Sequence, residues 1–409
     1  MNNIPLGWSC LQFKYAFKAV PFTTKIKQKE YALTGQYPII DQGEYFIGGY
    51  SDNNYGLITD IPVIAFGDHT RRFKYIDFPF IPGADGLKIY KPIYSETKFS
   101  FYQCLTLEFP NRGYARHNAL LQKCHFYLPP IEEQGRIVEK IEELFSDIDN
   151  GIKDLKTAQA QIKQYRQSVL KSAFEGKLYK TSEWKEVKLE DVCSKITDGS
   201  HFSPKSKIDG LYPYITVKDV KNDIIDFANS KRIDKDEYDL LVKSGCKPQL
   251  NDVLFSKDGT VGKVVLIKYN KEFVVLSSLA IIRPKQIIES KFLYYILKSP
   301  QFLIEATNKK VGVAIRRIIL ATLKKISVPL PTIPEQQQIV AEIEKRFAVA
   351  DEMENAVNDS LLQAEKLKQS ILKQAFAGKL VPQNPNDEPA SVLLGRIKAA
   401  KENSTKGKK

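Results

Sequence analysis

The side chains best suited to chemistry in this sequence are basic and hydrogen-bonding residues that collect beside glycines. Arginine and lysine can grip guanine edges or neutralise phosphates, asparagine and glutamine can read adenine, and serine or threonine can serve either purpose. The earlier group is His69, Thr70, Arg71, Arg72, Lys74, Tyr114, Arg116, His117 and Asn118. The later group is Asp198, Ser200, His201, Lys218, Lys257, Arg316 and Arg317. The pattern is typical of a surface that binds nucleic acid, and its plain alternative is ordinary solvated loop charge.

Patterns that would support catalysis are weak. The glycines of DGTVGKV, Gly259 and Gly262, are too close together for a phosphate-binding loop, and Val264 stands where that loop needs Ser or Thr. We therefore predict a hairpin in which these glycines supply positive φ angles. The Asn/Asp-Pro-Pro-aromatic tetrad of a methyltransferase is missing, and Glu-x-Lys tripeptides that could belong to a metal nuclease fit surface charge better. The four histidines lack ligand spacing, so we expect no metal site.

The elements that must position these side chains include one long segment that the chain contains twice. Leu128–Leu178 corresponds to Leu330–Leu380, and both ends give the same offset of 202 residues. Apolar residues recur every three or four positions in both copies, which is typical of a long helix. Gly176 and Gly378 follow the last periodic residues as C-terminal caps. Glu132–Phe174 alone would form a helix of roughly 64 Å at ~1.5 Å per residue.

The only two tryptophans, Trp8 and Trp184, each open a module that ends at a repeated helix. The sequence predicts a short helix and a strand just before each long helix, and a mixture of α and β in each module. The segments predicted to form strands are 37–43, 62–80 and 105–109 in the first module, and 212–220, 252–267 and 273–284 in the second. A helix is predicted over 292–307.

The fold class that follows is α+β, with two mixed α/β modules separated by two long helices. If these helices pair as an antiparallel coiled coil, the tandem repeat acquires a pseudo-two-fold axis. The expected domains are a first module at 1–130, a long helix at 131–178, a second module at 179–333, a long helix at 334–380, and a short helix with a basic tail at 381–409. Asn386 or Asp387 is expected to cap the last helix, with disorder beyond Lys401.

Composition indicates the charge of the partner, the state of the cysteines and the cellular compartment. The net charge of +13 favours a polyanionic partner. The five cysteines show no close pairing, so reduced and mostly buried thiols are expected. The sequence has no run of eighteen apolar residues and no signal pattern at its start, which predicts a cytoplasmic protein without a membrane partner.

The sequence resembles the specificity subunit of type I DNA restriction–modification systems from Trp8 to Ile397. The motifs that carry the resemblance are the doubled LPPIEEQ and LPTIPEQQQIV, the doubled LKxAFxGKL, YPIIDQG, FGDHTR, ITDGSH, DVLFSKDGTVGK and DEPASVLL. The resemblance implies that the two modules are target-recognition domains that bind a bipartite sequence in double-stranded DNA. It also implies two methyltransferase subunits, which would carry S-adenosylmethionine, and two restriction subunits as partners. This chain would hold no cofactor and catalyse nothing itself.

Two other interpretations compete with this one. A scaffold that does not bind DNA could carry two lectin-like or peptide-binding modules on a coiled-coil spacer. A specificity chain of a fused system could carry its own methylase or nuclease. DNA binding through several phosphates must weaken steeply with added salt, whereas binding of an uncharged ligand should barely respond. The salt dependence of binding therefore separates the DNA-binding interpretation from the scaffold. Modification or cleavage of DNA by the purified chain would identify the second.

Overall fold

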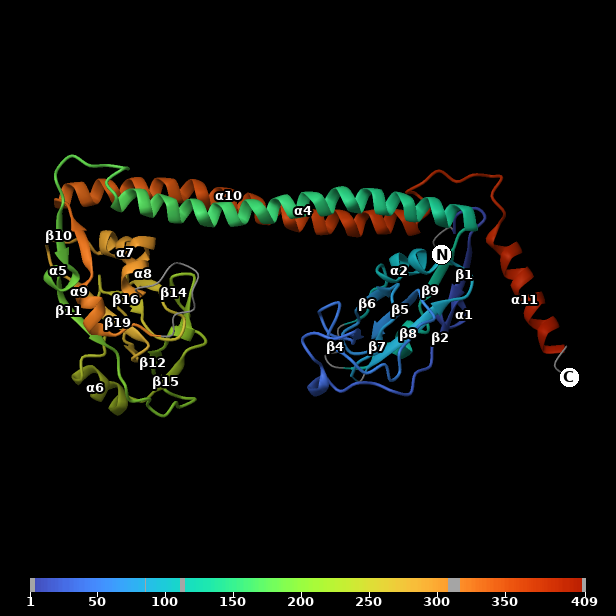
Figure 1. The fold of residues 1–409 in the computed structure, drawn as a ribbon, viewed down its shortest axis with the longest axis horizontal. Helices are drawn as coiled ribbons and strands as arrows, with labels where there is room; N and C mark the ends of the chain where they lie inside the picture. Colours follow the sequence, from blue (N-terminus) through green and yellow to red (C-terminus); the bar gives the residue numbers. More distant parts are fainter. Residues whose placement is uncertain (1–3, 85, 111–114, 308–316, 407–409) are drawn as a thin grey trace. The chain divides into compact units, whose positions relative to one another are not determined.

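The computed structural model of the 409-residue chain describes residues 4–84, 86–110, 115–307 and 317–406 (Figure 1). The chain divides into two compact units. Unit 1 comprises Met1–Leu155 and Asp359–Lys409, and unit 2 comprises Lys156–Asn358. Each unit therefore combines one module with part of both long helices.

The two long helices are α4 (Ile131–Phe174) and α10 (Ile333–Phe376), each of 44 residues and again offset by 202. This confirms the predicted repeat, although both helices end before the expected boundaries at 178 and 380. Gly176 and Gly378 adopt φ of 71° and 69°, as a C-terminal cap requires. The residue after each glycine donates its backbone N–H five residues back, from Lys177 to Ser172 O at 2.9 Å and from Lys379 to Gln374 O at 2.9 Å.

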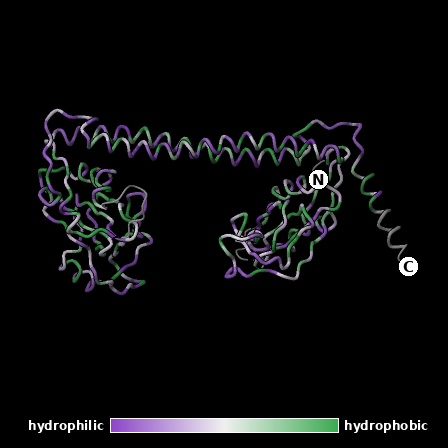
Figure 2. Tube along the Cα trace, in the orientation of Figure 1, coloured by the Kyte–Doolittle hydropathy of each residue, from purple (hydrophilic) through white to green (hydrophobic). Residues whose placement is uncertain are grey.

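Within each unit the two helices run antiparallel. In unit 2, Gln159 Nε2 donates to Asn358 Oδ1 at 2.8 Å, and Arg166 Nη2 lies 2.6 Å from Asp351 Oδ1, so that a later residue of α4 meets an earlier residue of α10. In unit 1, Lys368 bonds Asp149 and lies over the ring of Phe145. Apolar and polar residues alternate along both helices (Figure 2), because one stripe of each helix faces its partner.

The module of unit 1 is built on two sheets. The first is antiparallel, in the order β2 (Phe17–Ala19), β8 (Leu87–Pro92), β5 (Val63–Gly67), β6 (Phe73–Ile76). The second has the order β4 (Gly49–Ser51), β3 (Tyr37–Ile40), β7 (Ile81–Pro82), with β3 and β7 parallel. A further pair joins β1 (Ser9–Gln12) to β9 (His125–Leu128). The helical elements are α1 (Phe13–Ala16), η1 (Gln28–Glu30), α2 (Thr97–Cys104) and α3 (Asn118–Leu121).

The module of unit 2 repeats this topology. Its antiparallel sheet has the order β11 (Cys193–Asp198), β19 (Leu279–Pro284), β16 (Val253–Ser256), β17 (Val264–Leu266). Its second sheet has the order β15 (Lys231–Ile233), β12 (Tyr212–Ile215), β18 (Val274–Val275), with β12 and β18 parallel. The remaining strands pair β10 (Lys185–Lys188) with β20 (Ser327–Leu330) and β13 (Val220–Lys221) with β14 (Ile224–Ile225). The helical elements are α5 (Leu189–Val192), η2 (Val217–Asp219), α6 (Lys235–Lys243), α7 (Ser290–Lys298), α8 (Pro300–Thr307) and α9 (Leu320–Lys325).

Strand register confirms that the tryptophans mark equivalent starts. The residue after Trp8 pairs with Leu128, and the residue after Trp184 pairs with Leu330, the counterpart of Leu128. The predicted helix and strand before each long helix are present as α3 with β9 and α9 with β20. The tandem repeat of mixed α and β modules is therefore a property of the fold.

The doubled Glu-Gln of the repeat anchors each long helix to its own module. Gln134 Oε1 accepts from the amide of Glu96, which precedes α2, and Gln134 Nε2 donates to Pro129 O at 3.1 Å. Gln336 makes the same pair of contacts, with the amide of Glu289 before α7 and with Pro331 O. Both glutamines are buried, so each ties the start of a module helix to the start of the long helix.

Three predicted elements are wrong. Residues 105–109 form no strand, because Leu105 and Thr106 close the end of α2 through bonds to Phe101 O and Gln103 O. The helix predicted over 292–307 is broken at Ser299, whose ψ of 147° reflects the following proline. The last helix, α11 (Ala390–Lys406), starts after the expected cap at Asn386 or Asp387 and continues past Lys401. In the described part of the chain, no helix is both long and apolar enough to cross a membrane.

Candidate nucleic-acid interface

The hairpin between β5 and β6 presents the first group of candidate residues. Gly67 N–H donates to Arg72 O at 2.9 Å, and Arg71 N–H donates to Gly67 O at 2.7 Å, so the loop closes on itself. Arg71 has a φ of 62°, in the left-handed region where a residue other than glycine is strained. Strain of this kind persists only where surrounding contacts hold the residue in place, and strained residues cluster at functional sites. The hairpin therefore holds a charged side chain where glycine would fold more easily.

A second loop, 41–46, supports this hairpin from the side. Gln42 Oε1 accepts from the amide of His69 at 3.1 Å, and the hydroxyl of Thr70 donates to Gln42 O at 2.7 Å. Arg72 reaches Glu44 at 3.2 Å, with 50% of the arginine side chain exposed. Gln42 and Glu44 are not among the residues that the sequence singled out, although YPIIDQG, which contains Gln42, is one of the motifs that carry the family resemblance.

Lys74 lies in the interior instead of on the surface. Its side chain is 6% exposed, and its Nζ donates to Asp41 O at 2.8 Å and to Tyr45 O at 2.6 Å. Burial lowers the pKa of Lys74, and the carboxylate of Asp41 opposes that change. Because its donors are used by the protein, Lys74 holds the loop 41–46 in place and does not face a ligand.

His117 and Asn118 are also held by the protein. Asp68 Oδ1 accepts from the amides of His117 at 2.8 Å and Asn118 at 2.6 Å, and the His117 ring is fully buried. The hydroxyl of Tyr90 donates to Asn118 Oδ1. These contacts tie the start of α3 to the β5–β6 hairpin. They leave Arg116 exposed beside it.

In unit 2 the hairpin between β16 and β17 occupies the equivalent place. Gly259 and Gly262 have φ of 72° and 91°, which confirms the predicted role of both glycines. Lys257 is 2% exposed, and its Nζ lies 3.1 Å from Asp198 Oδ1 at the end of β11. The other oxygen of Asp198 lies 3.1 Å from His201 Nε2, whose side chain is 66% exposed. Lys257 is thus a buried partner that orients Asp198, and Asp198 in turn positions His201.

Both modules connect this hairpin to the following short helix in the same way. His117 N–H donates to Asp68 O at 2.9 Å in unit 1, and Ile318 N–H donates to Lys257 O at 2.7 Å in unit 2. Arg116 and Arg317 therefore emerge at corresponding positions, one residue before the anchoring amide, and both are exposed. The register that matches Arg116 with Arg317 comes from these backbone contacts, since the constant offset of 202 residues would match Arg116 with Ile318.

The remaining candidates surround these anchors. Ser200 N–H donates to Val275 O at 2.9 Å, next to the turn at Ser278 whose carbonyl accepts from Lys257 N–H at 3.0 Å. Lys218 is exposed in η2, and Val217 N–H donates to the hydroxyl of the same Ser278 at 3.1 Å. The structure thus brings Asp198, Ser200, His201, Lys218, Lys257 and Arg317 to one end of the second module. Tyr114 and Arg316 lie outside the described residues.

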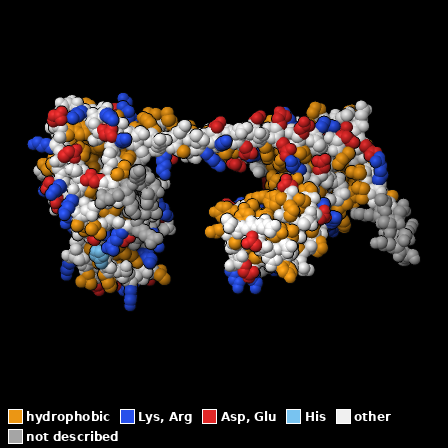
Figure 3. Space-filling view, viewed as in Figure 1, with side chains coloured by type: hydrophobic (Ala, Val, Ile, Leu, Met, Phe, Trp, Pro, Cys, Tyr) orange, Lys and Arg blue, Asp and Glu red, His pale blue; other side chains and the backbone are white. Residues whose placement is uncertain are grey.

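Charge alone does not single out these loops. Figure 3 shows lysine and arginine side chains spread over the viewed face of both units. What distinguishes the loops is that a buried ion pair or hydrogen-bond network fixes each one and leaves exposed donors beside it. Such an arrangement can present Arg72 and Arg116, or Arg317, His201 and Lys218, to an anion or to a base edge.

Comparison with known proteins agrees with the repeat. Residues 21–157 and 181–363 match the family model described as "Type I restriction modification DNA specificity domain". The chain therefore belongs to the type I restriction–modification DNA specificity family. A solved chain, reported under the heading of complex assembly and conformational transition of the type I R-M system, is 20% identical with a TM-score of 0.65 over 92% of this chain and 100% of its own length. That likeness supports the fold.

Two relatives come from Escherichia coli. The chain is 31% identical to the Type I restriction enzyme EcoBI specificity subunit, over 68% of this chain and 65% of that protein. It is 26% identical to the EcoR124I/EcoR124II specificity subunit, over 84% of this chain and 86% of that protein. The chain thus spans slightly under two thirds of the length of the EcoBI subunit and most of the length of the other.

Proposed function

We propose that this chain is a specificity subunit that binds a bipartite sequence in double-stranded DNA, one half-site for each module. The observation that carries the proposal is the repeated hairpin anchor, in which His117 and Ile318 fix equivalent backbone carbonyls and leave Arg116 and Arg317 exposed. Membership of the DNA specificity family supports the same conclusion. Because the loops of the two modules differ in sequence, the two half-sites should also differ.

The chain would lend this specificity to separate methyltransferase and restriction subunits and would catalyse nothing itself. S-adenosylmethionine would be held by the methyltransferase partner. In such an assembly the long helices α4 and α10 would set the distance between the half-sites, since they are the parts of the repeat with matched length. The complex would act in the cytoplasm, where its DNA lies.

Mapping methylated sites in the host genome with and without this gene identifies the target sequence. An oligonucleotide with that target is then titrated with the purified protein at several salt concentrations. We expect the logarithm of the binding constant to fall linearly with the logarithm of salt, by ~0.9 for each phosphate that the protein neutralises. The double variant Arg71→Gln, Arg72→Gln should lower this slope by about one for each phosphate that it no longer binds.

Lys140→Gln is a control for loss of charge away from the loops, because it removes a positive charge from α4, where Lys140 pairs with Glu143. It should leave the slope unchanged. Binding that does not respond to salt, or a double variant that binds like the wild type, would contradict the proposed interface. Modification or cleavage by the purified chain alone would show that it carries its own enzyme.

A further inference from the structure

The loop 41–46 of unit 1 exposes two aromatic side chains beside the β5–β6 hairpin. Tyr45 is 79% exposed and Phe46 is 47% exposed. The Phe46 ring packs edge-on against Phe78, with the ring centroids 6.0 Å apart. Single exposed aromatic side chains are common on protein surfaces, so exposure alone assigns no role to them. What distinguishes this pair is the way in which the protein holds its backbone.

A buried lysine fixes the backbone of both aromatic residues. Lys74 Nζ donates to Asp41 O at 2.8 Å, to Tyr45 O at 2.6 Å and to Phe46 O at 3.3 Å. The N–H of Gly43 donates to Asp41 Oδ1 at 2.8 Å and closes the start of the same loop. Removing an ammonium group from water is unfavourable unless its donors find partners. Here the partners are carbonyls of one loop, so the buried charge holds two exposed rings on a fixed backbone.

The second module holds the equivalent loop in the same manner. Lys263, at the start of the second arm of the β16–β17 hairpin, donates from Nζ to Val217 O at 3.2 Å and to Val220 O at 2.5 Å. These carbonyls belong to the segment that follows β12, just as loop 41–46 follows β3, and β3 and β12 are the central strands of equivalent sheets. The residue of segment 216–220 that is exposed is Lys218, a candidate DNA contact. Both modules therefore use a lysine of the hairpin to fix this loop.

Phe46 also borders a hollow of about 360 Å³ next to the β5–β6 hairpin. The residues that line this hollow with Phe46 include Glu44, Arg71, Arg72, Leu105 and Leu107. Cationic donors suit phosphates and base edges, whereas apolar surface suits the methyl group or the face of a base. The loop thus brings aromatic surface to the place where the arginines of the candidate interface lie.

We propose that Tyr45 contacts the apolar surface of a base in the first half-site, and that Phe46, packed on Phe78, supports it. This inference rests on the proposed DNA-binding function and adds a base-contacting residue to it. Contact between a ring and a base stabilises the complex without neutralising a phosphate, so it releases no counterion. Tyr45 therefore contributes to affinity independently of salt, whereas Arg71 and Arg72 contribute through their charge.

The test compares ring removal with charge removal on the target that methylation mapping identifies. We expect Tyr45→Ala to weaken binding about tenfold at every salt concentration and to leave the salt slope unchanged. Tyr45→Phe keeps the ring and should bind like the wild type. Tyr15→Ala is the matched control, because Tyr15 is 59% exposed in α1 of the same module, and α1 lies beside β1, away from β4 (Figure 1). It should leave the affinity unchanged.

Two modified DNA targets identify the surface that Tyr45 contacts. Uracil in place of each thymine removes a methyl group, and 2-aminopurine in place of each adenine reports unstacking as a rise in fluorescence. A uracil that weakens binding by the wild type but not by Tyr45→Ala indicates contact with a thymine methyl group. A rise in fluorescence that Tyr45→Ala abolishes indicates contact with the face of a base. Either result supports the proposal.

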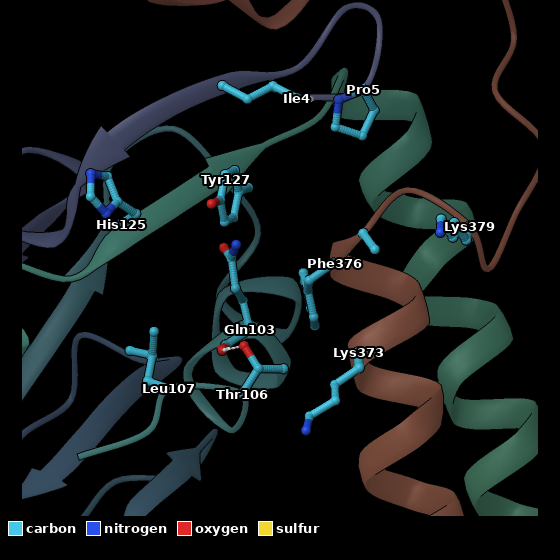
Figure 4. A pocket seen from close by; sticks show the side chains of 11 residues that line it. Ile4, Pro5, Gln103, Thr106, Leu107, His125, Tyr127, Lys373, Phe376 and Lys379 are labelled. Carbon is cyan, nitrogen blue, oxygen red and sulfur yellow. Dashed lines mark hydrogen bonds between the residues drawn. The ribbon is translucent and has the colours of Figure 1, made fainter. Parts of the chain in front are cut away.

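Hydroxyl-radical footprinting, read by mass spectrometry, locates the contact in the wild type. Target DNA should protect Tyr45 from oxidation and leave Tyr127 as reactive as in the free protein. Tyr127 and Phe376 line a groove of about 630 Å³ between β9 and the last turn of α10, which contains none of the candidate interface residues (Figure 4). Tyr127 therefore serves as the internal reference for protection.

The inference is overturned if Tyr45→Ala, shown to be folded by circular dichroism, binds like the wild type or lowers the salt slope. It is also overturned if DNA protects Tyr45 no more than Tyr127, or if neither modified target distinguishes Tyr45→Ala from the wild type. In each of these cases the wild type still binds with a steep salt dependence, and the proposed function stands. A wild type that does not bind its target overturns both.

Discussion

The doubled Glu-Gln motif predicts that two equivalent glutamates make opposite contributions to stability. Glu335 is buried in unit 2, and Oε1 accepts from the amide of Thr181 and Oε2 from the hydroxyl of Ser182, each at 2.6 Å. Burial acts to raise its pKa, but the hydrogen bonds from Ser182 and Thr181 prevail and lower the pKa from 4.5 to about 2. Its counterpart Glu133 is equally buried, yet burial raises the pKa of Glu133 despite the hydrogen bond from Trp8.

The sign of each glutamate's contribution to the free energy of unfolding follows from the linkage between proton binding and folding. Since the pKa of Glu335 is lower in the folded protein, its contribution to the free energy of unfolding is fully present above about pH 4.5 and is lost as the pH falls through about 2. A drop of this size corresponds to about 3 kcal/mol, which solvent screening reduces to about 2 kcal/mol. For Glu133, with its raised pKa, the contribution is present below the unfolded value and is lost as the pH rises through the folded one.

We therefore expect Glu335→Gln to destabilise unit 2 by about 2 kcal/mol at pH 7, whereas Glu133→Gln should leave unit 1 unchanged or slightly more stable. The single tryptophan of each module makes the two units separately visible, with Trp8→Phe and Trp184→Phe backgrounds isolating each signal. In urea, with a slope of about 2 kcal/mol per molar, the midpoint of unit 2 should fall by about 1 M.

The pH dependence supplies the control. The difference between Glu335→Gln and the wild type should narrow below about pH 4.5 and disappear near pH 2. Equal shifts for the two variants at pH 7, or a larger destabilisation by Glu133→Gln, would refute the argument that their hydrogen-bond partners decide the sign.

Three further perturbations test the interface and the repeat. Lys74→Met removes the donor for Asp41 O and Tyr45 O and should cost unit 1 about 3 kcal/mol in urea unfolding; an unchanged midpoint would mean that these bonds are dispensable. Asp198→Asn leaves the buried Lys257 without its carboxylate and should lower the free energy of unfolding of unit 2 by about 3 kcal/mol in urea. Adding Lys257→Met to this variant should restore most of that loss. Inserting four residues in both long helices, after Leu155 and after Asn358, adds about 6 Å with ~40° of rotation, and mapped methylation sites should gain one to two base pairs of spacer at ~3.4 Å each. An active protein with an unaltered spacer would show that the helices do not set it.

Much of the architecture could be predicted because it depends on local periodicity. The period of the apolar residues, the glycines after the last turn and the constant offset are all visible in the sequence, and helix propagation needs little else. The break between α7 and α8 was not predicted, because the apolar pattern continues across Ser299. Pro300 is the sequence signal that could have indicated it. Residues 105–109 resemble a strand by composition, but they have no partner in either sheet of their module.

The candidate site, too, could be predicted only in part from the sequence. The sequence alone determined that two modules carry basic loops beside glycines and that long helices of equal length follow them. Only the tertiary structure decided that Lys74 and Lys257 are buried anchors while Arg72 and Arg317 remain exposed, since the fate of a lysine depends on partners such as Asp41 and Asp198 that are distant in sequence. Burial is set by contacts between distant segments, and no local pattern encodes them.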